Sequence, residues 1–271
     1  MARPPIRLIA TDLDGTLLRT DGSVSERTCA AVRRALAAGI EVVPATGRPR
    51  IVTFDVISRL PFVDHWIFAN GSVTWHQGRS ELIRGFWLQP QLARTLITAL
   101  REGLPEAGFA VEFEDDVAFE AGFEKVVPQV PTVGASEDLL DRIDRRVQKL
   151  LVFDPTRSIE ELFAEVTVIV GDRGVPSYSG LSFIELAASL VTKATAIELL
   201  AKQLGLTVEE VATFGDNHND VSMLKWSGRS FAMAGATDDA QEAATEIIGW
   251  NDDDSVAAKI DELVAETLSN G

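Results

Sequence analysis

The sequence predicts an α/β protein in which a doubly wound parallel sheet is interrupted by an inserted α+β domain. Short apolar runs alternate with amphipathic helix patterns up to about residue 85, and the same βαβ rhythm returns after Thr192. Between these parts the pattern changes to helices and strands with antiparallel connections. We therefore expect a core domain made of residues 1–85 and 189–271, and an inserted domain of residues 86–188.

The first half of the predicted core starts with a buried strand. Residues 6–11 form a short apolar run bounded by polar residues, which is typical of a strand covered on both faces. Ser25 is of a type that caps helix N-termini and Gly39 of a type that follows helix C-termini, so we expect a helix between them. The elements expected next are strand 40–45, helix 49–59, strand 66–69 and a hairpin of 73–76 with 81–83.

The remaining elements follow from the same patterns. In the inserted part we expect helix 91–101 and strands at 110–119, 147–153 and 166–170. In the second half of the core we expect helix 193–204, strand 211–214, a short helix after His218, strands 230–233 and 246–248, and helix 255–268.

Composition and charge exclude several classes of function. Of the 271 residues, 41 are Asp or Glu and 25 are Lys or Arg, which gives a net charge of −16. A duplex-DNA binder needs clustered cations to displace phosphate counterions, and the sequence has no such cluster. No apolar run approaches the roughly 18 residues of a membrane-spanning helix, and the one cysteine, Cys29, cannot form an internal disulfide. We expect a cytoplasmic monomer or small homo-oligomer with no nucleic-acid or membrane partner.

Three polar clusters follow predicted strands of the core, at residues 12–16, 46–48 and 215–220. In an open parallel sheet, ligands bind beyond the carboxyl ends of the strands. We therefore expect these clusters, which are distant in the sequence, to meet at one edge of the sheet.

Four carboxylates dominate that edge: Asp12, Asp14, Asp216 and Asp220. Carboxylates brought together repel each other unless a cation or a proton lies between them. A ligand set of oxygen atoms, with no His or Cys, suits a hard cation, and Mg²⁺ suits a phosphate substrate. The alternative is that Asp12 and Asp14 form an Asx turn and bind nothing.

Two further features suit an anionic substrate. The hydroxyl and backbone N–H groups of Thr46-Gly47-Arg48 would form an anion cradle, or the glycine could simply end a strand. Arg48 can also form a bidentate contact with phosphate. Lys193 lies at a helix start, where a cation opposes the helix dipole, so either an anion lies beside it or it is a solvated surface lysine.

Together these clusters resemble the four motifs of the haloacid dehalogenase (HAD) superfamily of aspartyl-nucleophile phosphatases. The matching segments are Asp12-Leu13-Asp14-Gly15-Thr16-Leu17, Thr46-Gly47-Arg48, Lys193, and Gly215-Asp216 with Asn219-Asp220. The insert resembles the C2-type (C2B) cap of the Cof-like subfamily, and so do Ala45-Thr46-Gly47-Arg48-Pro49 and Asn70-Gly71-Ser72. The chain departs from that subfamily at Ala194 and at Ala234-Gly235, where members usually have Gly and a Gly-Asn pair.

The resemblance implies a Rossmann-like core and an Mg²⁺-dependent phosphatase that acts through an aspartyl-phosphate on Asp12. Asp14 would be the general acid and base, and Thr46 and Lys193 would complete the catalytic set. The phosphoryl group would be held by Gly47, Arg48 and Asn219. The metal would be bound by Asp12, Asp14 and Asp216, with Asp220 orienting these ligands from behind.

The implied substrate is a small phosphorylated metabolite, such as a sugar phosphate. The alternatives are a phosphomannomutase-like phosphotransferase and a catalytically weak, metabolite-binding regulatory protein. In the cap, the acidic run Glu112, Glu114, Asp115 and Asp116 either contacts the substrate or, as we expect, is a solvated strand edge.

Overall fold

A computed structural model of the chain describes residues 4–120, 123, 132–136 and 138–270. The chain divides into two compact units. The first consists of residues 1–47, 55–84 and 192–271, and the second of residues 48–54 and 85–191. Each unit has its own sheet and its own apolar core, and each is described by itself below.

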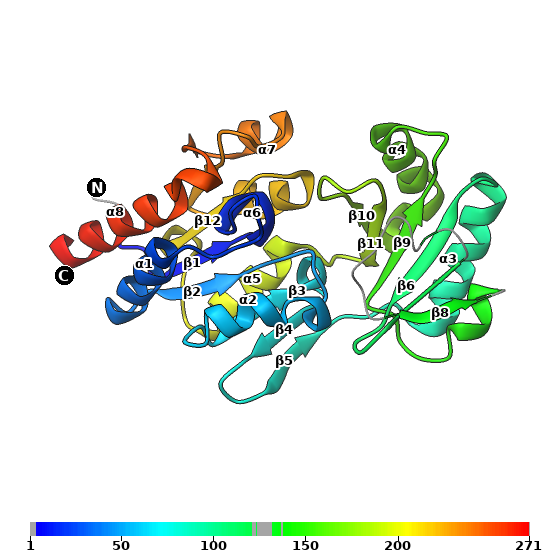
Figure 1. The fold of residues 1–271 in the computed structure, drawn as a ribbon, viewed down its shortest axis with the longest axis horizontal. Coiled ribbons are helices and arrows are strands. Elements are labelled where there is room, and N and C mark those ends of the chain that lie inside the picture. Colours follow the sequence, from blue (N-terminus) through cyan, green and yellow to red (C-terminus); the bar gives the residue numbers. More distant parts are fainter. Residues whose placement is uncertain (1–3, 121–122, 124–131, 137, 271) are drawn as a thin grey trace. The chain divides into compact units, whose positions relative to one another are not determined.

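The first unit is built on a five-stranded sheet in the order β14-β13-β12-β1-β2, in which neighbouring strands are parallel. Figure 1 labels three of these strands, β12, β1 and β2. Its strands are β1 (Leu8–Thr11), β2 (Glu41–Pro44), β12 (Val211–Gly215), β13 (Arg229–Ala232) and β14 (Glu246–Ile247). The first and last parts of this unit therefore meet in the middle of the sheet, where β1 pairs with β12.

Helices cover both faces of this sheet. Ile9 packs into a core formed with α1 (Glu26–Ala37) and α8 (Ser255–Asn270), whereas its neighbours Leu8 and Ala10 pack into a core formed with α5 (Lys193–Gln203) and α6 (Val221–Trp226). Successive side chains of a strand point to opposite faces, so β1 is buried on both. The predicted doubly wound α/β fold is confirmed.

Local signals in the sequence fix the helix ends. Ser25 caps α1, and its Oγ accepts the N–H of Thr28 at 3.0 Å. The expected helix 49–59 is broken into a 3₁₀ turn, Arg50–Val52, and α2, Phe54–Arg59. A last short helix, α7, spans Asp238–Ala243.

A small second sheet completes the first unit, in the order β3-β4-β5. Its strands are β3 (His65–Phe68), β4 (Val73–His76) and β5 (Glu81–Gly85). A single parallel bridge from Ala45 to Ile67 joins β3 to the edge of the main sheet. The turn between β3 and β4, residues 69–71, therefore lies next to the end of β2.

The second unit is a six-stranded, mostly antiparallel sheet in the order β10-β11-β9-β6-β7-β8. Its strands are β6 (Gly108–Glu112), β7 (Val117–Glu120), β8 (Thr132–Ser136), β9 (Lys149–Phe153), β10 (Gly174–Ser177) and β11 (Ile184–Ala188). Two helices, α3 (Pro90–Gly103) and α4 (Ile159–Val170), share one apolar core with the sheet.

Two expected strands of the insert are wrong. Residues 110–119 form two strands, β6 and β7, because Glu114 and Asp115 lie in the turn between them. Residues 166–170 belong to helix α4, which starts with a capping box in which the side chain of Ser158 and that of Glu161 bond to each other's backbone N–H. The β-branched residues of α4 favour a strand locally, but the cap and the buried positions at a spacing of four favour the helix.

The acidic run of the insert is not uniformly solvated, which corrects our expectation for its first member. Asp115 and Asp116 pair with Arg145 near the surface. Glu112 is buried on β6, and its carboxylate lies 3.2 Å from Nζ of the equally buried Lys149, which also bonds to Glu185. Burial, opposed by Lys149, raises the pKa of Glu112 to about 7.

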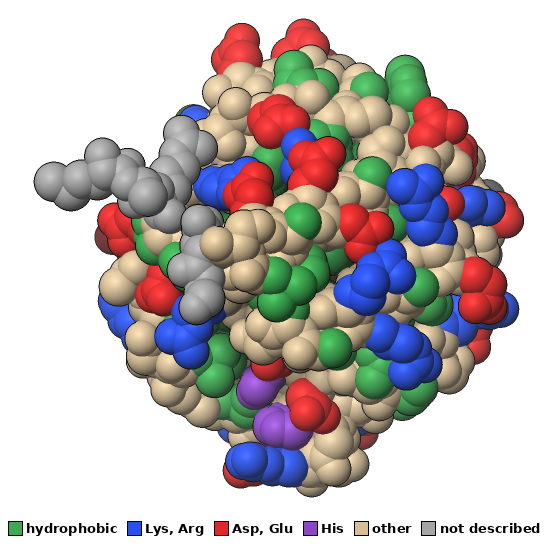
Figure 2. Space-filling view, turned by 90° about the vertical axis from the view of Figure 1, so that its left-hand side faces the viewer, with side chains coloured by type: hydrophobic (Ala, Val, Ile, Leu, Met, Phe, Trp, Pro, Cys, Tyr) green, Lys and Arg blue, Asp and Glu red, His purple; other side chains and the backbone are tan. Residues whose placement is uncertain are grey.

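No helix within the described residues is both long and apolar enough to cross a membrane. Figure 2 shows acidic and basic side chains intermingled on the face it presents. Exposed ion pairs join elements of the first unit, such as Arg34 of α1 with Asp261 of α8. Such exposed pairs contribute little stability individually.

Candidate active site

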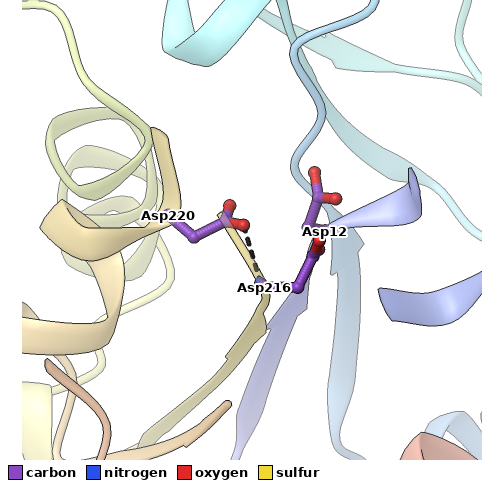
Figure 3. Close-up of side chains that lie close together, drawn as sticks. All are labelled: Asp12, Asp216 and Asp220. Carbon is purple, nitrogen blue, oxygen red and sulfur yellow. Dashed lines mark hydrogen bonds between the residues drawn. The ribbon is translucent and has the colours of Figure 1, made fainter. Parts of the chain in front are cut away.

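The site begins where β1 and β12 end. These parallel neighbours are in register, with Thr11 beside Phe214, and the N–H of Asp12 donates to the carbonyl of Phe214 at 2.9 Å. Asp12 and Asp216 follow directly from the two strands, so the sheet itself places them side by side. Figure 3 shows their carboxylates together with that of Asp220.

A buried lysine joins two of these carboxylates. Nζ of Lys193 lies 2.5 Å from Oδ1 of Asp12 and 2.6 Å from Oδ1 of Asp220. Lys193 is 0% exposed at the start of α5, so it is not a solvated surface lysine. Burial alone would lower the pKa of Lys193, but the attraction of Asp12 and Asp220 outweighs it and raises the pKa above its ordinary value. The lysine is therefore a fixed positive charge.

One lysine does not neutralise three carboxylates. Burial raises the pKa of Asp12 well above its ordinary range, against the opposing effect of Lys193, and Asp220 and Asp216 raise it further. Burial, followed by the charge of Asp220, raises the pKa of Asp216 to about 7. These three carboxylates and Lys193 therefore carry an excess of negative charge when the carboxylates are ionised.

A bound cation would neutralise the excess negative charge of these carboxylates. One carboxylate oxygen each from Asp12, Asp216 and Asp220 lies within 4.8 Å of the others. The donor set contains oxygen atoms alone, which fits a hard divalent cation such as Mg²⁺ and does not suit a soft metal. The residues present therefore fit the metal that the sequence motifs imply.

Gly15 and Thr16 fix the position of Asp216. Oγ1 of Thr16 donates to Oδ1 of Asp216 at 2.6 Å. Gly15 has φ of +77°, and a Cβ there would lie 2.4 Å from Oδ2 of Asp216. Only glycine combines this backbone conformation with so close an approach. Both residues belong to the first quoted motif, but the sequence alone gave them no role.

Asp220 is committed to contacts within the protein. It is fully buried, and its Oδ2 accepts the N–H groups of Asp216 and Asn217 at 2.9 and 3.0 Å, while Oδ1 accepts from Lys193. Figure 3 shows the bond from the backbone of Asp216 as a dashed line. Asp220 thus holds the loop after β12 and the lysine in place together.

The other expected residues have different surroundings. Asp14 is exposed, in the turn that follows Asp12, and its charge contributes to the raised pKa of Asp216. Thr46 is buried just beyond β2, with its N–H bonded to the carbonyl of Ile67 at 2.9 Å. Arg48 is the first residue of the segment 48–54, which belongs to the second unit.

Asn219 contacts Asn70, a residue to which the sequence analysis assigned no function. Nδ2 of Asn219 donates to Oδ1 of Asn70 at 3.0 Å, and both side chains are buried. Asn70 lies in the turn between β3 and β4 with φ of +55°. The Asn-Gly pair at 70–71 was a signal for a turn, but not for a contact with residue 219.

Comparisons with known proteins agree with this geometry. Residues 9–260 match the family of haloacid dehalogenase-like hydrolases. Phosphatase YwpJ of Bacillus subtilis (strain 168) is 28% identical, over 96% of this chain and 100% of its own length. The 5-amino-6-(5-phospho-D-ribitylamino)uracil phosphatase YcsE of the same strain is 28% identical, over 94% of each chain.

A solved structure confirms the fold. The crystal structure of SMU.1108c from Streptococcus mutans UA159 superposes with a TM-score of 0.87 at 23% identity, over 96% of this chain and 99% of that one. The family match covers most of the chain, and the two relatives described above are named phosphatases. The chain therefore belongs to the haloacid dehalogenase-like hydrolases, as a Cof-like phosphatase that acts on small phosphorylated substrates.

Proposed function

We propose that the protein is an Mg²⁺-dependent phosphatase in which Asp12 attacks the phosphorus of a metabolite monoester. The observation that supports this most strongly is the convergence of Asp12, Lys193, Asp216 and Asp220 at the ends of β1 and β12. A module that merely bound a metabolite would have no need for a buried carboxylate held by a lysine at this point. Burying these charged groups costs free energy, which favours a site that uses them in a reaction.

In the first step a carboxylate oxygen of Asp12 forms a bond to phosphorus, and the bond from phosphorus to the ester oxygen breaks. The leaving alkoxide takes a proton from the carboxyl group of Asp14. The exposed position of Asp14, two residues from the nucleophile, supports this role, because the group must be open to the leaving alkoxide in the first step and to the attacking water in the second.

In the second step water attacks the phosphorus of the aspartyl-phosphate. Asp14, now ionised, accepts the proton of that water, and the bond from phosphorus to Asp12 breaks to release inorganic phosphate. One residue thus acts first as acid and then as base, and the enzyme returns to its starting protonation state.

The remaining groups offset charge. Lys193 opposes the repulsion between Asp12 and the phosphate, and the hydroxyl of Thr46 with the N–H of Gly47 would hold the phosphoryl oxygens. Asp12, Asp216 and the Asp14 backbone carbonyl would hold Mg²⁺, which when bound neutralises carboxylate and phosphoryl charge. Arg48 is proposed as a further phosphate contact.

The substrate that we propose is a phosphate monoester with a small, hydroxyl-bearing leaving group. The relative YcsE supports this proposal, because it is a phosphatase of a phosphorylated ribityl compound. Sugar phosphates fall into the same chemical class. A phosphotransferase that returns the phosphoryl group to a sugar is the second candidate, and it differs in excluding water as the acceptor.

The test is a phosphate-release screen. Purified protein is incubated with sugar phosphates, 5-amino-6-(5-phospho-D-ribitylamino)uracil, pyridoxal phosphate and flavin mononucleotide, with Mg²⁺ or with a chelator. We expect release from at least one ester, dependent on Mg²⁺ and absent in Asp12→Asn. Transfer to an added sugar without release would favour the phosphotransferase, and wild-type rates in Asp12→Asn would refute the nucleophile.

A further inference from the structure

The turn between β3 and β4 has a strained backbone. Ala69, Asn70 and Gly71 all have positive φ, at 51°, 55° and 104°. For a residue with a Cβ this conformation is unfavourable, and Asn bears it more easily than Ala. Such strain persists where the surrounding contacts determine the conformation, and it is common at functional sites.

Those contacts all lead to the active-site loops. The N–H of Asn70 donates to the carbonyl of Thr46 at 3.0 Å. A Cβ on Gly71 would lie 2.3 Å from the carbonyl oxygen of Thr192, the residue that caps α5. Oδ1 of Asn70 accepts from Nδ2 of Asn219. The turn thus contacts the loop after β2, the start of the helix that begins with the catalytic lysine, and the loop after β12.

The amide of Asn219 is only partly used by the protein. Oδ1 of Asn219 is buried and has no hydrogen-bond partner among the described residues. An unpaired buried amide oxygen is costly, so its retention points to a hydrogen-bond donor that arrives with the substrate. The bond to Asn70 fixes the plane of the amide and so determines where this free end lies.

We propose that Asn70 is a positioning residue for the phosphatase reaction: its side-chain oxygen orients the amide of Asn219 toward the substrate. This inference rests on the proposed function of the same site. Two properties are required at position 70: tolerance of a left-handed backbone and a hydrogen-bond acceptor within reach of residue 219. Asparagine supplies both, whereas glycine supplies only the first and alanine neither.

That difference provides the experiment. Asn70→Gly keeps the backbone conformation and removes the acceptor, while Asn70→Ala removes the acceptor and also strains the backbone. We expect kcat/KM to fall about tenfold or more in both variants, since losing an orienting partner typically costs about 10–100-fold. The inhibition constant for inorganic phosphate should rise in both. Thermal unfolding should show Asn70→Ala to be less stable than Asn70→Gly.

A purely structural role predicts a different result: Asn70→Gly would resemble wild type, and only Asn70→Ala would be impaired. That outcome would overturn the proposal. The double variant Asn70→Gly with Asn219→Ala gives a second test, because two residues that act as a unit should lose no more together than Asn219→Ala loses alone. Multiplying losses would overturn the proposal, whereas a wild type that released no phosphate from any ester would instead refute the proposed function.

Discussion

Replacing Lys193 with methionine should destabilise the fold in a way that depends on pH. The lysine is fully buried and bonds to Asp12 and Asp220 at 2.5 and 2.6 Å. Methionine fills a similar volume but leaves both carboxylates without this cation. Breaking a buried ion pair from one side costs about 3–5 kcal/mol, so we expect the free energy of unfolding to fall by that amount at about pH 8.

The sign of the pH dependence follows from the carboxylates. The folded-state pKa of Asp12 is already raised by burial, and losing Lys193 removes the main effect that opposes this rise. A group with a raised folded-state pKa favours folding more as the pH falls, because the folded protein then binds the proton. The deficit of Lys193→Met should therefore shrink when the pH is lowered toward about 5.

Urea unfolding at both pH values, in metal-free buffer, measures this deficit. Lys202→Met is the matched control, because Lys202 lies on the same helix, is 66% exposed and pairs with Glu198 at the surface. Its loss should cost at most about 1 kcal/mol. A Lys193→Met protein as stable as wild type at both pH values, or equally destabilised at both, would refute the reasoning.

Three further predictions follow from other parts of the molecule. Gly15→Ala should be destabilised more than Gly22→Ala and should lose phosphatase activity. The two glycines have similar φ angles, +77° and +78°, but an added Cβ meets Asp216 at Gly15 and, among the described residues, nothing within 4 Å at Gly22. Equal stability and activity in the two variants would contradict this. The pKa of Glu112 is about 7 in the folded protein against 4.5 ordinarily, so the wild type should lose about 3 kcal/mol of unfolding free energy as the pH rises from 4.5 to about 7. Chemical denaturation should show this loss to be absent in Glu112→Gln. The same pH profile of unfolding free energy in the variant and the wild type would contradict the prediction. Asp14→Ala should slow both the formation and the hydrolysis of the phosphoenzyme in rapid-quench kinetics, whereas slowing of one step alone would assign the other proton transfer elsewhere.

The core fold and the meeting of the distant motifs could be predicted because they follow from local rules. A short apolar run, the cap Ser25 and a following run give a βαβ unit, and parallel strands bring their carboxyl ends to one edge. The positions of Asp12 and Asp216 after β1 and β12 depend on nothing else. The place of Lys193 at a helix start left two interpretations, a neighbouring anion or a solvated lysine, and the structure supports the first.

What could not be predicted depends on contacts between distant residues. Burial of Glu112 requires Lys149 on a neighbouring strand, and nothing in an acidic run announces that partner. The role of Asn70 depends on a positive φ and on a residue 149 positions away. Residues 166–170 of α4 resemble a strand because several of them are β-branched, although Ser158 and Glu161 carry the capping-box signal of a helix start.

The central claim, that Asp12 takes the phosphoryl group, is tested most directly by trapping it. Asp14→Asn enzyme is mixed with a substrate ester and Mg²⁺, quenched in acid and examined by intact and peptide mass spectrometry. The account predicts the added mass of one phosphoryl group on the peptide that contains Asp12, and none in the Asp12→Asn enzyme. A phosphoryl group on another residue, or phosphate release by Asp12→Asn at the wild-type rate, would contradict it.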